Sequence, residues 1–125
     1  MEVPGAKNNK LLVCCYEALG TAGLIIAINW SASNESPLNA NVIGMYIMTA
    51  ALCWGGITGG HFNAAITIGV LIKEARKSRL ENYIFFLMII FAQIIGAILG
   101  VCIVRGGVVI KDCYIYPNLA KLCPP

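Results

Sequence analysis

Long runs of apolar residues alternate with short polar segments along this chain. The runs cover residues 11–28, 40–57 and 83–104, and the only charged residue within them is Glu17. A helix needs about 20 predominantly apolar residues to cross the roughly 30 Å hydrocarbon core of a bilayer. The pattern therefore predicts an all-α, integral, multi-pass membrane protein with three transmembrane helices in the lipid bilayer.

A fourth apolar stretch, residues 64–73, is only half as long as a crossing requires. As a helix it would extend about 15 Å, which is half of the hydrocarbon core. Gly59 and Gly60 before it allow a tight turn, and Asn63 is a favoured residue for capping a helix N-terminus. We therefore predict a re-entrant half-helix over residues 64–73 that begins near the middle of the bilayer.

A helix N-terminus at this depth would favour the passage of neutral molecules over that of cations. Its partial positive charge raises the energy of cations and of hydronium beside it. The amide of Asn63 can hydrogen-bond a passing water molecule and orient it. Alternatively, residues 59–63 could form an ordinary cytoplasmic loop that leads into an amphipathic helix on the membrane surface.

Composition and charge agree with a membrane protein. Of the 125 residues, 58% are hydrophobic and only 12% are charged, whereas a soluble domain is typically about 25% charged. The formal net charge is +3, but the basic residues lie beside apolar runs and do not interleave with exposed aromatic residues. We therefore expect no nucleic-acid partner.

Short basic segments indicate the orientation of the chain. Two lysines lie in residues 1–10 and four basic residues lie in residues 73–79, whereas residues 29–39 contain none. Loops that carry Lys and Arg tend to remain cytoplasmic. We expect a cytoplasmic tail over residues 1–10, and three crossings then place residues 105–125 on the opposite side as a loop or tail without further elements.

The six cysteines do not form a recognisable metal or redox motif. Four of them lie inside the apolar runs, where a thiol behaves as a small hydrophobe: Cys14, Cys15, Cys53 and Cys102. Cys113 and Cys123 lie outside and could pair if their side faces an oxidising compartment. The one histidine, His61, has no acid or base beside it in its motif. We expect no metal, no cofactor and no enzymatic activity.

Several short motifs resemble those of the aquaporins, or major intrinsic proteins. Residues 59–67 read Gly-Gly-His-Phe-Asn-Ala-Ala-Ile-Thr, which is similar to the first signature of that family, Gly-Ala-His-x-Asn-Pro-Ala-Val-Thr. Glu17, Gly20 and Thr21 resemble the Glu-x-x-Gly-Thr of its first helix, and residues 92–97 resemble a motif of its third. The resemblance covers nearly the whole chain and implies the first, N-terminal repeat of an aquaporin-like bundle.

The resemblance also implies roles for individual residues. Asn63 would be the pore asparagine, in a signature motif that also includes Ala64 and Ala65. The backbone carbonyls around Gly59, Gly60 and His61 would line the cytoplasmic half of the path. Glu17 and Gln93 would be buried polar residues that hold the re-entrant loop in place. This agrees with the general expectation that an ionisable residue inside a membrane is functional.

Small residues on the helices predict close packing. Gly96 and Gly100 form a small-xxx-small pair, which permits helices to approach closely or to dimerise, and Gly20 belongs to the same class of packing position. At Ala64 the chain departs from the family signature, which has proline there. Alanine can still start the helix, but it adds one backbone donor that needs a partner.

The chain contains one of the two inverted repeats that the family combines into a pore. The selectivity arginine and the second asparagine of the family belong to the other repeat and match nothing here. The chain could be part of a longer channel, could assemble with a second chain, or could be a degenerate half-channel. In each case we expect a second half-repeat to contact the Asn63 loop, in an oligomer or larger membrane complex.

These observations lead to two hypotheses of function. The first is a membrane channel, or half-channel subunit, for passive transport of water or small neutral solutes. The alternative is a degenerate, aquaporin-like structural subunit of a larger membrane complex that transports nothing. The capped half-helix favours the first, whereas the single repeat and the alanine at position 64 motivate the second.

Overall fold

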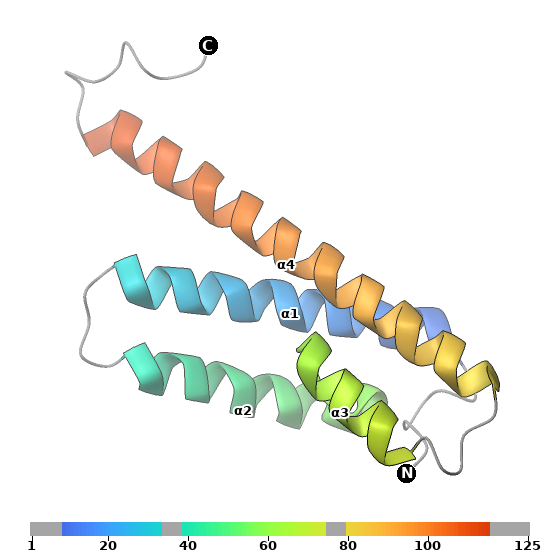
Figure 1. Ribbon diagram of the computed structural model, residues 1–125. Helices are drawn as coiled ribbons and strands as arrows, with labels where there is room; N and C mark the ends of the chain where they lie inside the picture. The colour runs from blue at the N-terminus through green and yellow to red at the C-terminus, as the bar shows by residue number, and fades with distance from the viewer. Residues whose placement is uncertain (1–8, 34–38, 75–79, 116–125) are drawn as a thin grey trace.

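The computed structural model describes residues 9–33, 39–74 and 80–115, and within them the chain is helical apart from short connections. It has four helices: α1 (Lys10–Ser33), α2 (Asn39–Thr58), α3 (Ala64–Glu74) and α4 (Leu80–Ile115). Helix α1 lies between α2 and α4, and the short α3 lies beside the first half of α4 (Figure 1). Helices α1 and α2 run alongside each other, and α4 crosses α1 at an angle (Figure 1).

Three of the four helices are long and apolar enough to cross a membrane. The apolar segments are Lys10–Ser31, Asn39–Thr58 and Asn82–Gly106. Helix α3, with 11 residues, is too short for a crossing, which needs about 20. The expected fold class, three transmembrane helices plus one short helix, is therefore confirmed, and the chain is an integral, multi-pass membrane protein.

Helix α1 is longer than the sequence pattern predicts. We expected a polar loop over residues 29–39, but α1 continues through Ser33 and α2 already begins at Asn39, so the prediction was wrong for residues 29–33 and 39. The side-chain amide of Asn29 donates to the carbonyl of Ile25 at 2.8 Å, and the hydroxyl of Ser31 donates to the carbonyl of Ile28 at 3.0 Å. These bonds to the preceding turn let polar side chains remain within a helix.

Helix α4 also extends beyond its predicted end. We expected a loop from Arg105 onward, but the helix reaches Ile115, so the prediction was wrong for residues 105–115. This segment contains no proline, and the first one that follows is Pro117. Because the residue before a proline disfavours the helical region, helices usually end near that point. Residues 116–125, with Cys123, lie outside the described part, so the structure does not test the hypothesis that Cys113 and Cys123 pair in an oxidising compartment.

Glycines allow α1 and α4 to cross closely. A Cβ atom on Gly96 would collide with the backbone carbonyl of Ala18, and one on Gly100 would lie 2.7 Å from the carbonyl oxygen of Ala22. Both glycines are spaced by four residues and therefore lie on one face of α4. A small apolar core beside this crossing consists of Val13, Cys14, Phe85 and Ile89.

Helix α2 packs on α1 along one edge only. The hydroxyl of Tyr46 donates to the carbonyl of Gly20 at 2.9 Å, and the ring of Trp54 stacks on that of Tyr16 with centroids 5.9 Å apart. Most of the remaining α2 surface is exposed, including Leu52, which is 77% exposed. This helix therefore presents a broad apolar face outside the bundle formed by the described residues.

Candidate functional site

The segment between α2 and α3 turns sharply through three residues with positive φ. These are Gly59 at 90°, Gly60 at 67° and Phe62 at 46°. Glycine adopts this region readily, and the amide of Gly60 is further held by the hydroxyl of Thr58 at 2.9 Å. A phenylalanine in this region is strained, so the neighbouring structure must stabilise Phe62.

Glu17 provides that stabilisation from the first half of α1. Its carboxylate is fully buried and accepts hydrogen bonds from the backbone amides of His61, at 3.1 Å, and Phe62, at 2.7 Å. The side-chain amide of Gln93 on α4 donates to the same carboxylate at 2.8 Å. Hydrogen bonds to a charged acceptor are the stronger kind, so α1 holds the backbone of the turn directly.

Thr67 extends this network into α3. Its buried hydroxyl accepts from the amide of Gln93 at 2.9 Å and lies 3.2 Å from Nδ1 of His61. The single proton of this hydroxyl can go to the carbonyl oxygen of Asn63, at 3.1 Å, or to Oε1 of Gln93, at 3.2 Å. Helices α1, α3 and α4 therefore share one continuous set of buried hydrogen bonds.

The ring of Phe62 fills the space above Gly20. Phe62 is 2% exposed, and any side chain on Gly20 would overlap its ring. The ring also meets Trp54 edge-on, with centroids 6.1 Å apart. Gly20, expected at a contact between helices, thus packs mainly against the turn, while its carbonyl accepts the bond from Tyr46 on α2.

Asn63 caps the N-terminus of α3. Its Oδ1 accepts from the amide of Ala65 at 2.8 Å, and its carbonyl accepts from the amide of Thr67 at 3.0 Å. Asn63 is exposed, and among the described residues nothing accepts a hydrogen bond from its Nδ2. The amide of Ala64 likewise meets no acceptor within this part of the chain. The two donors together form a small polar surface at the start of α3.

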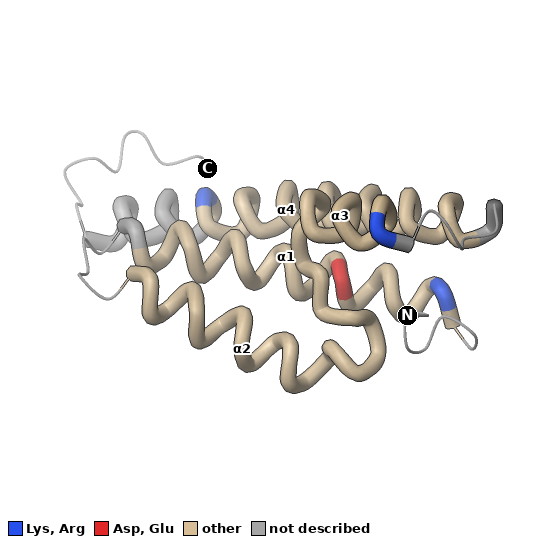
Figure 2. The backbone as a smooth tube through the Cα atoms, turned by 60° about the horizontal axis from the view of Figure 1, so that its bottom comes forward, with Lys and Arg blue, Asp and Glu red and all other residues tan. Residues whose placement is uncertain are grey.

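The network places this polar surface deep along the long helices. Glu17 lies seven residues after the start of α1 at Lys10, a rise of about 10 Å. Gln93 lies eleven residues after the start of the apolar segment at Asn82, a rise of about 16 Å. Figure 2 shows the acidic position inside α1, and basic positions at the start of α1, near the end of α3 and within α4. The turn is thus bonded to residues about 10 Å along α1 and about 16 Å along the apolar segment of α4, whereas a hydrocarbon core is roughly 30 Å thick.

Most sequence-predicted site residues converge at this place. Eight of them form or border the turn: Glu17, Gly59, Gly60, His61, Asn63, Ala64, Ala65 and Gln93. Gly96 and Gly100 lie instead at the crossing of α1 and α4. Among the described residues, no cluster of three His, Cys, Asp or Glu side chains that could hold a metal ion is present.

Sequence reasoning missed Thr67, Phe62 and Tyr46. Thr67 could have been found, because it follows Asn63 by four residues and so faces the same side of the short helix. The burial of Phe62 and the bond from Tyr46 depend on how α2 packs on α1, which a local pattern does not reveal.

Comparisons with known proteins give a consistent result. The major intrinsic protein family matches residues 10–117. Aquaporin-4 of Mus musculus is 36% identical over 84 residues, which are 62% of this chain and 24% of that protein. Aquaporin-5 of Ovis aries is 35% identical over 85 residues, 67% of this chain and 30% of that protein. No solved structure shows significant similarity.

A plant relative extends the matched region further. The probable aquaporin PIP2-7 of Oryza sativa subsp. japonica is 32% identical over 104 residues, which are 83% of this chain. The match covers 29% of that protein, so the chain corresponds to less than a third of the length of these relatives. Because the family match extends over most of the chain, including all four helices, this chain belongs to the major intrinsic protein family.

Proposed function

We propose that this chain forms one half of a membrane channel that passes water or small neutral solutes beside Asn63. The observation that supports this most directly is the hydrogen bonding of Glu17 to the backbone of His61 and Phe62. These bonds tie the segment before α3 to residues that lie well inside the apolar segments of α1 and α4, away from their ends. The alternative of a surface helix after a cytoplasmic loop is disfavoured, because such a loop would lie at the end of these helices.

The exposed chemistry at this depth suits a neutral permeant. The Nδ2 of Asn63 and the amide of Ala64 are donors, and the dipole of α3 places partial positive charge at the same end. A cation would be repelled there, whereas a water molecule can accept from the donors with its oxygen. Backbone at membrane depth is tolerated only against protein or a water-filled cavity, so a polar path beside Asn63 satisfies both requirements.

The free donors beside Asn63 also favour a protein partner at this surface. Lipid could not satisfy the donors of Asn63 and Ala64, and α2 exposes a broad apolar face. A second half-repeat, from the same longer chain or from another subunit, would cover the turn and complete the path. This arrangement fits an oligomer or a larger complex.

Osmotic shrinkage of proteoliposomes that contain the full-length protein tests the proposal. We expect faster shrinkage than in empty vesicles, and about a fivefold decrease in the protein-dependent rate for Asn63→Asp. This variant keeps a carboxyl oxygen to cap α3 but loses the Nδ2 donor, and one hydrogen bond is worth about 1 kcal/mol.

Asn9→Asp is the matched control, because Asn9 caps α1 in the same way, accepting from the amide of Leu12 at 3.3 Å. It should conduct like the unmodified protein. If the unmodified protein shrinks no faster than empty vesicles, conduction is wrong and the structural-subunit hypothesis is favoured. If Asn63→Asp conducts normally, the path does not pass Asn63.

A further inference from the structure

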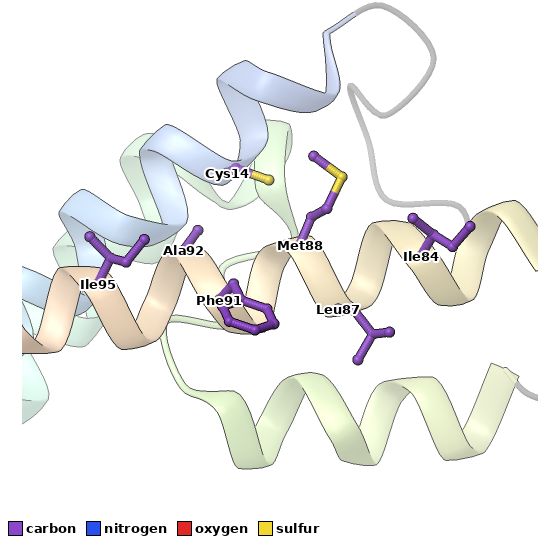
Figure 3. Close-up of a pocket in the computed structure, with 7 residues that line it drawn as sticks. All are labelled: Cys14, Ile84, Leu87, Met88, Phe91, Ala92 and Ile95. Carbon is purple, nitrogen blue, oxygen red and sulfur yellow. The ribbon is translucent and has the colours of Figure 1, made fainter.

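An apolar groove runs along the outer side of the α1–α4 pair. It has a volume of about 450 Å³ and is lined by Cys14 of α1 and by a stripe of α4 side chains that includes Ile84, Leu87, Met88, Phe91 and Ile95. Figure 3 shows these side chains along the first half of α4, with Cys14 facing Met88 across the groove. No residue that lines it is charged or strongly polar, so the groove suits an apolar occupant.

The length of the groove matches one leaflet of a bilayer. Ile84 and Ile95 are eleven residues apart, which corresponds to about 16 Å along a helix. One leaflet contributes half of the roughly 30 Å hydrocarbon core. The groove also begins near Asn82, where the apolar segment of α4 starts, so a bilayer whose boundary lies at Asn82 would have the groove within one leaflet.

The positively charged side chain of Lys10 lies at the end of the groove near Ile84. Lys10, the first residue of α1, holds its Nζ 5.8 Å from the centre of the Phe85 ring, next to the groove residue Ile84. Lys10 also precedes Cys14 by four residues and therefore shares its helix face. The side chain is exposed, and the described residues include no acidic group paired with it. An anionic group would complement this charge.

We propose that this groove binds one acyl chain of an anionic phospholipid whose headgroup phosphate pairs with Lys10. A flexible chain fits the groove better than a helix does. Helices in membranes associate through small residues that permit close approach, but the groove is lined by bulky side chains, and Gly96 and Gly100 already pack against α1. The occupant is therefore a lipid, and it belongs to the leaflet on the Lys10 side.

Quenching of tryptophan fluorescence by brominated acyl chains tests the proposal in the full-length protein. Phe91 lines the groove and is 67% exposed, so Phe91→Trp is a tolerated reporter. Leu52→Trp on α2 is the matched reporter outside the groove. Both are compared with the protein that carries only its native tryptophans, in bilayers of uncharged phospholipid with a minority of brominated anionic phospholipid.

We expect anionic lipid to be enriched about fivefold at Phe91→Trp over Leu52→Trp, since one lysine near an anionic headgroup is worth about 1 kcal/mol. Lys10→Gln should abolish this excess. Lys10→Arg should retain it, as should Arg105→Gln, which removes one exposed charge at the other end of the apolar segment.

Three results would overturn the proposal. Equal quenching of the two reporters would mean that the groove does not select anionic lipid. An excess that survives Lys10→Gln would mean that Lys10 does not recognise the headgroup. Protection of Phe91→Trp from brominated lipid of every charge would mean that a protein segment occupies the groove.

Discussion

At the scale of single residues, one buried carboxylate holds the irregular backbone of the turn between α2 and α3. Three donors converge on the carboxylate of Glu17, and two of them belong to the strained turn that contains Phe62. A buried carboxylate is costly unless it is well hydrogen-bonded. Its position is therefore explained by the turn: no neutral acceptor on α1 would stabilise two adjacent backbone amides as strongly.

We predict that Glu17→Gln lowers the free energy of unfolding by about 3 kcal/mol, the scale of one or two lost bonds to a charged acceptor. The new amide keeps one acceptor oxygen but places an N–H group against another donor. Thermal unfolding in detergent should show a lower midpoint. Leu19→Met changes an exposed residue two positions away and should leave the midpoint of unfolding unchanged. If the midpoint of Glu17→Gln equals that of Leu19→Met, the charge of Glu17 is not needed for stability.

At the scale of elements, the start of α3 tolerates the alanine that replaces the proline of the family signature. Ala64 is the first residue of the helix, where a backbone donor has no intrahelical partner in any case. The cap on the next amide, from Asn63 Oδ1 to Ala65, is intact. The departure in sequence therefore leaves the capped geometry in place and changes only the number of free donors.

This geometry predicts opposite effects for proline at adjacent positions. Ala64→Pro should keep α3 and raise the free energy of unfolding by about 0.4–1 kcal/mol, because proline restricts the unfolded chain and fits the first helical position. Ala65→Pro removes the amide that bonds to Asn63 and should destabilise the protein. The midpoint of thermal unfolding of each variant measures these two effects. A loss of stability in Ala64→Pro would show that the backbone at position 64 does not fit proline.

The α1–α4 crossing depends on the absence of side chains at specific glycines. Gly96→Ala places a methyl group against the backbone of Ala18 and should cost about 1–3 kcal/mol. Gly106→Ala, on the same helix, meets nothing within 4 Å and should instead stabilise by about 0.5–1 kcal/mol, as alanine favours a helix interior. The midpoint of chemical denaturation should therefore fall for Gly96→Ala and rise for Gly106→Ala. Equal shifts in the two variants would argue against the close crossing of α1 and α4.

At the scale of the whole molecule, the basic helix ends predict the orientation in the bilayer. Lys10 begins α1 and Lys73 lies in the last turn of α3, at the end of the bundle where α4 starts (Figure 1). Because basic termini tend to remain cytoplasmic, this end should face the cytoplasm. Arg105, at the other end of the apolar segment, should face the opposite side.

Labelling of single cysteines with a membrane-impermeant maleimide tests this orientation. In a cysteine-free background displayed at the cell surface, Arg105→Cys should react in intact cells, whereas Lys73→Cys should react only after permeabilisation. The reverse pattern would contradict the charge argument, and labelling of both from one side would contradict three crossings.

Much of the fold could be predicted from sequence, because apolar runs of membrane length need no knowledge of packing. The half-length of residues 64–73 and the cap at Asn63 were equally local signals. The helix ends at Ser33 and Ile115 could not be predicted from such local signals. Near Ser33, the bonds of Asn29 and Ser31 to the preceding turn form only once the helix exists. The contacts of Thr67 and Phe62 likewise depend on which helices become neighbours.

The hydrogen bond between Glu17 and Gln93 links positions 76 residues apart, and this separation has a consequence for biogenesis. At a synthesis rate of about 5–20 residues per second, the amide emerges about 4–15 s after the carboxylate. During that interval α1 and α2 exist without α4, so the carboxyl group of Glu17 needs another hydrogen-bond donor, such as water, in place of Gln93. Correct insertion of this protein therefore depends on how soon α4 follows α1, as well as on how apolar its helices are.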